Sequence, residues 1–132
     1  MLKEALKDLN LRDFIIELNQ DQLFEKGQTS TGRSLGEYSA FTIKLKQEKG
    51  QRVDHVTLKD TGEFYETFHI VVAQDGSYFE IIGDGDKDDK NLFDVYGEDV
   101  VGLDEESRNT LIRTKLYFKT QQYVREQIAR AA

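Results

Sequence analysis

The chain has 132 residues and a net charge of −7, with 38 % hydrophobic residues, 33 % charged residues, six Tyr and eight Phe. This length is typical of a single domain over residues 1–132, and the aromatic content excludes disorder along the whole chain. The absence of Cys excludes disulfides, thiolate nucleophiles and zinc sites built on sulfur.

Charge and hydropathy also limit the partners. The longest apolar runs are only a few residues, so we expect neither a signal peptide nor a membrane span. We therefore expect a soluble protein. The segment from Gly83 to Glu106 holds ten acids and two lysines, a local charge of −8. Because affinity for phosphates comes from clustered Lys and Arg, we expect no direct nucleic-acid binding.

The N-terminal segment has helical periodicity. Asn10 and Asp13 form a start signal, and the apolar residues after them recur at helical spacing until Gly27, which predicts a helix over about residues 11 to 26. A first short helix, or a continuation bent at Asn10, precedes it. The apolar face packs on the sheet of the same chain or, alternatively, serves a neighbouring subunit.

A polar loop is expected from Gly27 to Ser39, exposed and mobile unless a partner orders it. It does not match a phosphate-binding loop, because Glu37 and Tyr38 stand after Gly36 where a Walker motif needs Lys and Ser or Thr.

Residues 39–49 fit two structures. Alternation from Phe41 to Lys46 favours a strand, whereas Ser39 as a cap and the pair Phe41 and Leu45 favour a helix, and both remain open. This region opens a basic cluster of Lys44, Lys46, Lys49 and Arg52. Such a cluster is a solvated face or, alternatively, a contact for an acidic partner surface.

A brief strand around Val56 and Leu58 is predicted next, followed by a short helix capped by Asp60 and Glu63. The only two histidines, His55 and His69, are expected at the surface. No serine, carboxylate or second histidine is placed beside either one for catalysis or metal binding.

Two apolar runs, about 68–74 and 77–83, flank Asp75-Gly76 and predict a hairpin with a type I′ turn. The turn sets a register in which Ile70 faces Ile81 and Val72 faces Phe79. One face is then apolar and belongs to the core, and consists of Phe68, Ile70, Val72, Phe79 and Ile81. The other face is mixed and meets water or is partly covered by another strand or subunit.

The acidic segment begins with Asp84, Asp86 and Asp88, a spacing that suggests calcium. The EF-hand pattern then fails, because its sixth position is Asp89 rather than Gly and its twelfth is Val95 rather than Glu. We therefore expect a turn, a short helix near residues 90–96, and no cofactor.

The C-terminal segment predicts a long helix over about residues 105–130, capped by Asp104 with an apolar stripe along one side. At 1.5 Å per residue this helix is roughly 39 Å long, more than one small sheet needs, so part of it is expected to project toward another subunit. The expected class is α+β, with an N-terminal helix, a small antiparallel sheet and a long C-terminal helix.

The middle of the chain carries a loose family pattern. Its elements are a glycine-containing loop ending in an aromatic residue, a Thr and Lys four apart, and a Leu, Thr-Gly and aromatic series. Their counterparts are Gly32 to Tyr38, Thr42 and Lys46, then Leu58, Thr61, Gly62, Phe64 and Phe68. Over about residues 23 to 103 the chain resembles small tailed-phage virion-morphogenesis and tail-completion proteins.

The resemblance implies a non-enzymatic phage or prophage structural protein, acting as an oligomeric ring at the head–tail junction or tail end. Its partners would be further copies and other virion proteins, with no small-molecule substrate and no membrane. It would reside in the bacterial cytoplasm during assembly and then in the virion. The expected protein interface consists of Arg33, Tyr38, Lys44, Lys46, Lys49 and Arg52. The alternative is a small acidic protein-binding or inhibitor domain.

Overall fold

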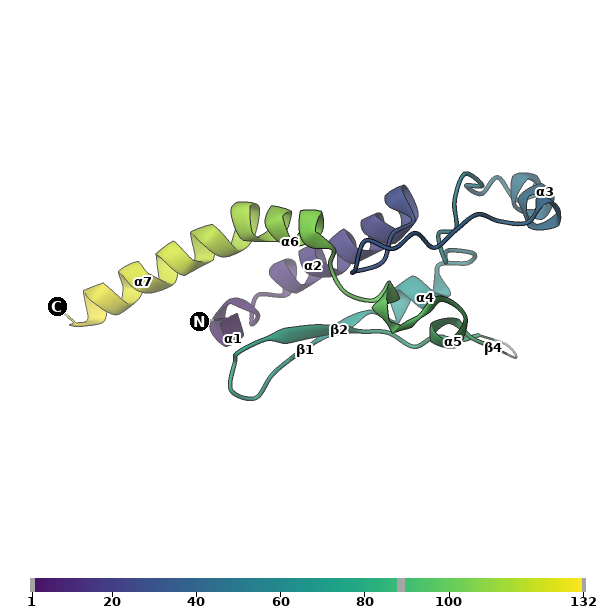
Figure 1. The fold of residues 1–132 in the computed structure, drawn as a ribbon. Coiled ribbons are helices and arrows are strands. Elements are labelled where there is room, and N and C mark those ends of the chain that lie inside the picture. Colours follow the sequence, from purple (N-terminus) through teal and green to yellow (C-terminus); the bar gives the residue numbers. More distant parts are fainter. Residues whose placement is uncertain (1, 88–89, 132) are drawn as a thin grey trace.

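The computed structural model describes residues 2–87 and 90–131, which form an α+β fold (Figure 1). The helices are α1 (Leu2–Ala5), α2 (Leu9–Asp21), α3 (Ala40–Glu48), α4 (Glu63–Glu66), α5 (Leu92–Tyr96), α6 (Glu105–Leu111) and α7 (Tyr117–Ala131). Turns of π-helix follow α2 (Gln22–Lys26) and α6 (Ile112–Leu116), and a 3-10 turn spans Glu98–Val100. The strands form two antiparallel pairs, β1 (His69–Val72) with β2 (Phe79–Ile82) and β3 (Asp86–Lys87) with β4 (Lys90–Asn91).

The N-terminal helix is present, but its cap differs from the prediction. Asp8 caps α2, with its Oδ1 accepting the backbone N–H of Asn10 at 2.9 Å, so the predicted start at Asn10 is wrong by two residues. The predicted stop is confirmed, because Gly27 adopts a left-handed φ of 62° and donates its N–H to the carbonyl of Leu23. Figure 1 shows α2 lying over the hairpin, and its apolar side faces the core.

The β1–β2 hairpin has the predicted register, with Ile70 opposite Ile81 and Val72 opposite Phe79. Its predicted core face is confirmed, because Phe68, Ile70 and Ile81 are buried. The turn is not type I′, since that type needs a positive φ at Asp75 as well as at Gly76, and only Gly76 has one. The Asp75 carboxylate instead accepts the N–H of Ser77.

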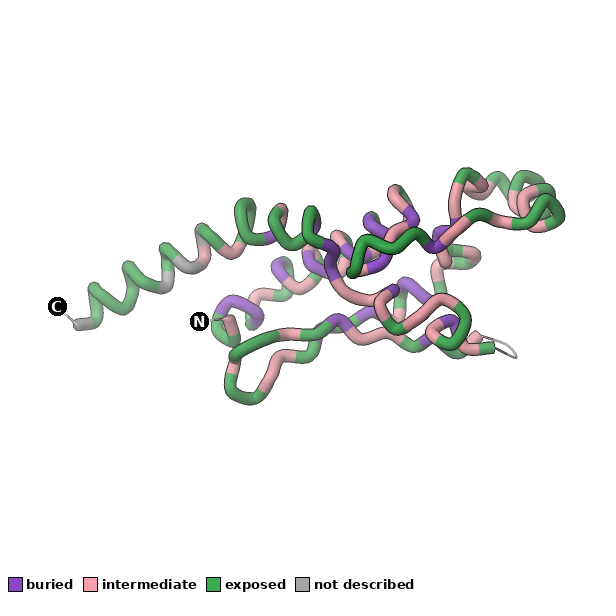
Figure 2. Tube along the Cα trace, viewed as in Figure 1, coloured by how far each residue is buried: buried purple, intermediate pink, exposed green. Residues whose placement is uncertain are grey.

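Buried residues gather where α2, the hairpin and the start of α6 meet (Figure 2). The long separation of these elements in the chain means that the core is built from both ends and the middle. The buried apolar side chains are Ala5, Leu6, Leu11, Ile15, Leu23, Leu35, Val56, Phe64, Tyr65, Phe68, Ile70, Ile81, Leu92, Val100, Leu103 and Leu111.

Residues 39–49 form helix α3, because the Ser39 hydroxyl caps it by accepting the N–H of Thr42 at 3.2 Å. The strand predicted around Val56 is absent. Leu58 has a left-handed φ of 58°, which breaks an extended conformation, and the N–H of Val56 bonds to the Gly36 carbonyl instead of a neighbouring strand.

The cap predicted at Asp60 is also wrong. Helix α4 begins after Gly62, whose φ is 88°, and it has no side-chain cap. The Asp60 carboxylate is turned instead toward the side chains of Gln51 and Lys49. The carboxylate therefore lies among donors on another part of the chain and accepts none of the N–H groups that open α4.

The acidic segment contains the predicted turn and short helix. Asn91 caps α5 by accepting the N–H of Phe93 at 2.9 Å. Asp88 and Asp89, which belong to the calcium-like pattern, lie outside the described residues. Within the described residues, no three His, Asp or Glu side chains converge as a metal ion would require.

The C-terminal helix begins as predicted, because Asp104 caps α6 by accepting the N–H of Ser107 at 2.8 Å. The helix continues through the π-turn into α7, which leaves the rest of the fold and carries the C-terminus away from it (Figure 1). None of the helices in the described part of the chain is long and apolar enough to cross a bilayer.

Candidate functional site

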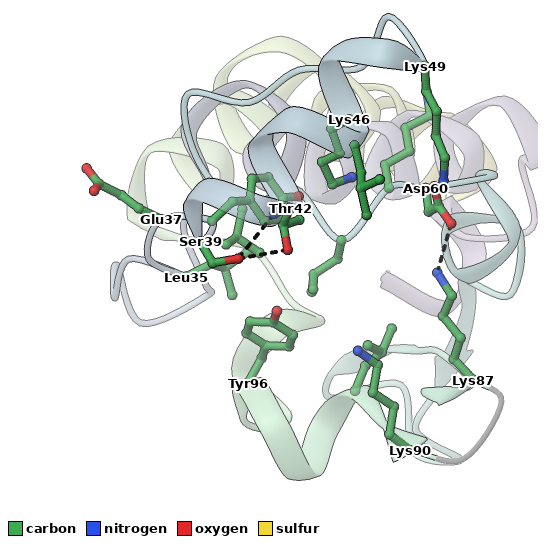
Figure 3. A pocket seen from close by; sticks show the side chains of 16 residues that line it. Leu35, Glu37, Ser39, Thr42, Lys46, Lys49, Asp60, Lys87, Lys90 and Tyr96 are labelled. Carbon is green, nitrogen blue, oxygen red and sulfur yellow. Dashed lines mark hydrogen bonds and ion pairs between the residues drawn. The ribbon is translucent and has the colours of Figure 1, made fainter.

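A basic cleft of about 410 Å³ opens between α3, the segment 56–60 and the β3–β4 and α5 region (Figure 3). Among the described residues, five lysines line it against two acids, Glu37 and Asp60, in a chain whose net charge is −7. The cleft therefore concentrates positive charge. The lysines are Lys46, Lys49, Lys59, Lys87 and Lys90.

Asp60 ties two walls of this cleft together. Its carboxylate lies 3.2 Å from the Nζ of Lys49 on α3 and 3.5 Å from the Nζ of Lys87 on β3. Hydrogen bonds from the Gln51 amide, the larger cause, and from Lys49 lower the pKa of Asp60 to about 2. Asp60 is therefore ionised at neutral pH and acts as a clamp, with a pKa far from that of a general base working near neutrality.

Tyr38 forms another wall. Its hydroxyl accepts the backbone N–H of Thr57 at 2.9 Å, which fixes the ring against the segment that was predicted to be a strand. The Nζ of Lys46 lies 4.8 Å from the centroid of the Tyr38 ring and donates to Gln51 at 3.3 Å. The negative face of the ring attracts the ammonium group, so this contact holds Lys46 beside Tyr38 at the cleft.

The remaining lysines differ in how they are held. The Nζ of Lys59 lies over the ring of Phe24, 5.1 Å from its centroid, and is held there by a cation–π contact. Lys90 is exposed and has no ion-pair partner among the described residues. Figure 3 shows the side chains of Lys90 and Tyr96 both directed into the cleft. Lys90 is thus available to an incoming anionic group.

The predicted interface residues separate into two groups. Tyr38, Lys46 and Lys49 line the cleft, whereas the other three lie outside it. Arg33 forms an ion pair with Asp99 at 2.7 Å, and Lys44 is exposed on α3.

The last of the six, Arg52, already has partners in its own chain. Its guanidinium contacts Glu25 at 2.8 Å and Asp54 at 2.6 Å. These two carboxylates raise the pKa of Arg52, with Asp54 the larger cause.

The sequence prediction missed Lys59, Lys87 and Lys90. Lys87 and Lys90 are the only basic residues between Gly83 and Glu106, which was a usable signal, but they were counted as part of an acidic segment. Only the fold shows that this segment turns its two lysines toward α3.

The acids of that segment are partly neutralised within the chain. Asp104 and Glu106 contact the Nζ of Lys26 at 3.0 and 3.1 Å. Arg33 lowers the pKa of Asp99 to about 2. The charge of −8 therefore overstates the free negative charge that this surface offers to a basic partner.

His55 is more enclosed than the surface position predicted for it. Its Nε2 lies 2.6 Å from the carbonyl of Phe24, and its ring packs against Gly27. Its Nδ1 lies 3.3 Å from the carboxylate of Asp54, so the prediction that no carboxylate stands beside it is wrong. His69 is exposed, as predicted. The two histidines thus occupy different environments.

Comparison of the chain with protein-family models, with curated proteins and with solved structures finds no match.

Proposed function

We propose that the chain is a non-enzymatic structural subunit of a phage or prophage particle, which assembles into an oligomeric ring at the head–tail junction or tail end. The observation that carries this proposal is the row of exposed apolar side chains on α7. Tyr117, Val124 and Ile128 are 56 %, 48 % and 65 % exposed, at spacings of seven and four residues that place them on one side of the helix. Exposed apolar stripes of this kind mark interaction surfaces.

The N-terminal end of α7 is held against the rest of the fold, which supports a role for the helix in presenting that stripe. Lys119 forms an ion pair with Asp8, the cap of α2, at 2.7 Å, and lowers the pKa of its carboxyl group. Beyond this contact the helix extends away from the body (Figure 1). A helix fixed at one end and exposed at the other is suited to reaching a neighbouring subunit.

The placement of the family pattern gives further support. Tyr38, Thr42, Lys46 and Leu58 come from three separate parts of that pattern and all line the basic cleft. Phe64 and Phe68, which complete the pattern, pack edge to face with ring centroids 5.0 Å apart. Residues of the pattern thus gather at the cleft and in the adjoining core, which supports the proposal.

The cleft supplies a second contact for assembly. Its lysines suit an acidic surface on the next copy or on another particle protein, and the chain carries a net charge of −7. A contact between two different surfaces is heterologous, and such contacts form a closed ring when the rotation between copies closes.

Sedimentation of the full chain and of a chain ending at Lys119, which keeps the ion pair with Asp8, tests this proposal. We expect the full chain to associate as concentration rises and the shortened chain to stay monomeric. High salt should weaken the association, because it screens the contact made by the lysines.

A point variant separates the stripe from the length of the helix. Val124→Asp adds a charge to the stripe and should abolish association, whereas Gln122→Asp adds the same charge on the opposite side and should not. If all chains stay monomeric, and a prophage lacking the gene still makes joined, infectious particles, the acidic binding or inhibitor domain replaces this proposal.

A further inference from the structure

A second, apolar groove of about 740 Å³ runs along the outer side of β2. One wall consists of the six consecutive residues 77–82, and the opposite wall includes Val101, Leu103 and Leu116. Neighbouring side chains on a strand point to opposite faces of the sheet. Six consecutive residues can line one groove only where the edge of the strand faces it.

The hydrogen bonding shows which backbone groups lie on that edge. The N–H of Ala73 donates to the carbonyl of Tyr78 at 2.9 Å, which makes these two residues a hydrogen-bonded pair. Such pairs alternate along an antiparallel ladder. In the register observed here, Glu80 and Ile82 bond toward β1, whereas the backbone groups of Phe79 and Ile81 point away from it.

The opposite edge of the sheet follows the same alternation, and α2 reaches one of its backbone groups. Ile70, which faces Ile81, directs its carbonyl away from β2, where the Nη1 of Arg12 on α2 donates to it at 3.4 Å. No comparable bond from any described residue reaches the backbone of Phe79 or Ile81. The edge of β2 is therefore open among the described residues, and it is the edge that lies inside the groove.

The open edge decides what kind of occupant the groove can take. A helix laid into the groove would cover the N–H and C=O groups of Phe79 and Ile81 without pairing them, at a cost in free energy. An extended chain would pair them by adding a third strand. Its alternate side chains would reach the apolar wall formed by Val101 and Leu103.

The charges on the groove select among extended chains. Glu80 on β2 and Glu98 on the 3-10 turn line it, and Arg108 on α6 is the one basic residue among the described residues of the lining. Opposite charges placed across a strand pair are favourable, and like charges are unfavourable. A strand with Lys or Arg beside Glu80 fits better than an acidic strand.

We propose that the edge of β2 receives an extended segment of another polypeptide, in which apolar residues alternate with Lys or Arg. This inference stands on the geometry of the hairpin and is independent of the proposed role in a phage particle. The segment becomes a third antiparallel or parallel strand and fills the groove between β2 and α6.

The N-terminus gives a direct test, because Leu2 also lines the groove. The probe is the peptide Lys-Val-Lys-Val-Lys-Val-Lys, joined to the N-terminus of the full chain through a Gly-Ser linker of about eight residues. A flexible linker of this length spans roughly 15 Å and holds the peptide at about millimolar effective concentration. The readout is amide hydrogen exchange measured by NMR.

In the chain without the peptide, we expect fast exchange at Phe79 and Ile81 and slow exchange at Glu80, which bonds to β1. The fused peptide should slow exchange at Phe79 and Ile81 at least about tenfold, with little change at Glu80. A fusion with Pro in place of Val, which cannot pair along a strand, should give no such protection. A fusion with Glu in place of Lys should protect less.

Three outcomes would overturn the proposal. Phe79 and Ile81 already protected in dilute, unfused chain would mean that the edge is not open. Equal exchange in the Lys-Val and Pro fusions would mean that no strand is added. Protection of the unfused chain that rises with its concentration would make a second copy the occupant instead.

Discussion

The side chain of Asn19 on α2 bridges two backbone groups of the segment that leads into α6. Its Nδ2 donates to the carbonyl of Val100 at 3.1 Å, and its Oδ1 accepts the N–H of Gly102 at 2.8 Å. Asn19 is fully buried, so both bonds lie away from water. The amide therefore fixes where the chain returns to α2 before α6 begins.

Replacement of Asn19 by Leu should destabilise the fold strongly. Leu is of similar size but leaves the Val100 carbonyl and the Gly102 N–H buried without partners, at a cost of about 2–4 kcal/mol in the free energy of unfolding. Asn10→Leu, at an exposed position of the same helix, should change it by less than about 0.5 kcal/mol. Equal losses in urea unfolding would show that the Asn19 bonds are not important.

The hairpin register makes a second prediction. Ile81 is only 6 % exposed, and Ile81→Ala should lower the free energy of unfolding by about 2–5 kcal/mol through lost burial and a cavity. Val71 lies on the opposite face and is 48 % exposed, so Val71→Ala should cost less than about 1 kcal/mol. If thermal or urea unfolding showed a larger loss of stability for Val71→Ala than for Ile81→Ala, the face assigned to the core would be wrong.

Gly27 offers a third test, because two constraints act there together. A Cβ at Gly27 would lie 2.7 Å from Cδ2 of His55, and the residue also has a left-handed φ. Gly50 has a left-handed φ of 71° with nothing within 4 Å of its added Cβ, so Gly50→Ala reports the backbone cost alone, about 1–2 kcal/mol. Gly27→Ala should cost about 1–3 kcal/mol more.

The contribution of His55 to that difference can be isolated. In a double-mutant cycle with His55→Ala, the extra cost of Gly27→Ala should shrink, because the ring that meets the new methyl group is gone. An unchanged cost would assign the whole effect to backbone strain.

Asp99 gives a prediction for acid. Arg33 beside it lowers the pKa of this carboxyl from its ordinary value of 3.8 to about 2 in the folded chain. The folded state therefore binds this proton more weakly than the unfolded state, so the stabilisation is complete above about pH 4 and disappears as the pH falls toward 2.

Asp99→Asn removes this contribution. The stability difference between the natural chain and the variant, measured by urea unfolding, should be constant from pH 7 to 5 and shrink between pH 4 and 2. Asp60, whose pKa is also lowered to about 2, is present in both chains and cancels in the comparison. A difference that stays constant down to pH 2 would contradict the role of the Arg33 ion pair.

The parts of the fold that local signals determine were predictable. The hairpin register follows from alternation around Asp75-Gly76, and the start of α6 follows from Asp104 as its cap. These signals act between residues a few positions apart. All the groups that form these structures are therefore present in a short stretch of sequence.

The wrong predictions between residues 56 and 60 have a different cause, which is competition from groups elsewhere in the chain. Asp60 looked like a cap, but Gln51 and Lys49 hold its carboxylate. Val56 looked like part of a strand, but its N–H bonds to Gly36, and Leu58 departs from extended backbone.

The basic cleft was only partly predictable for the same reason. Lys46 and Lys90 meet across one opening although 43 other residues separate them in the chain. Residue patterns report charge along the chain, whereas the cleft depends on charge across the folded surface.

The π-helical turn at Ile112–Leu116 has a consequence for how the C-terminal helix can vary. A π-turn holds one residue more than an α-turn, so deletion of a single exposed residue such as Arg113 would let regular α-helix run from α6 into α7. A deletion in a regular α-helix turns everything after it by about 100°, but a π-turn and an α-turn both complete one revolution, so Val124 and Ile128 would keep their side of the helix. The π-turn is thus a place where the chain tolerates a change of one residue in length while the exposed stripe of α7 keeps its direction.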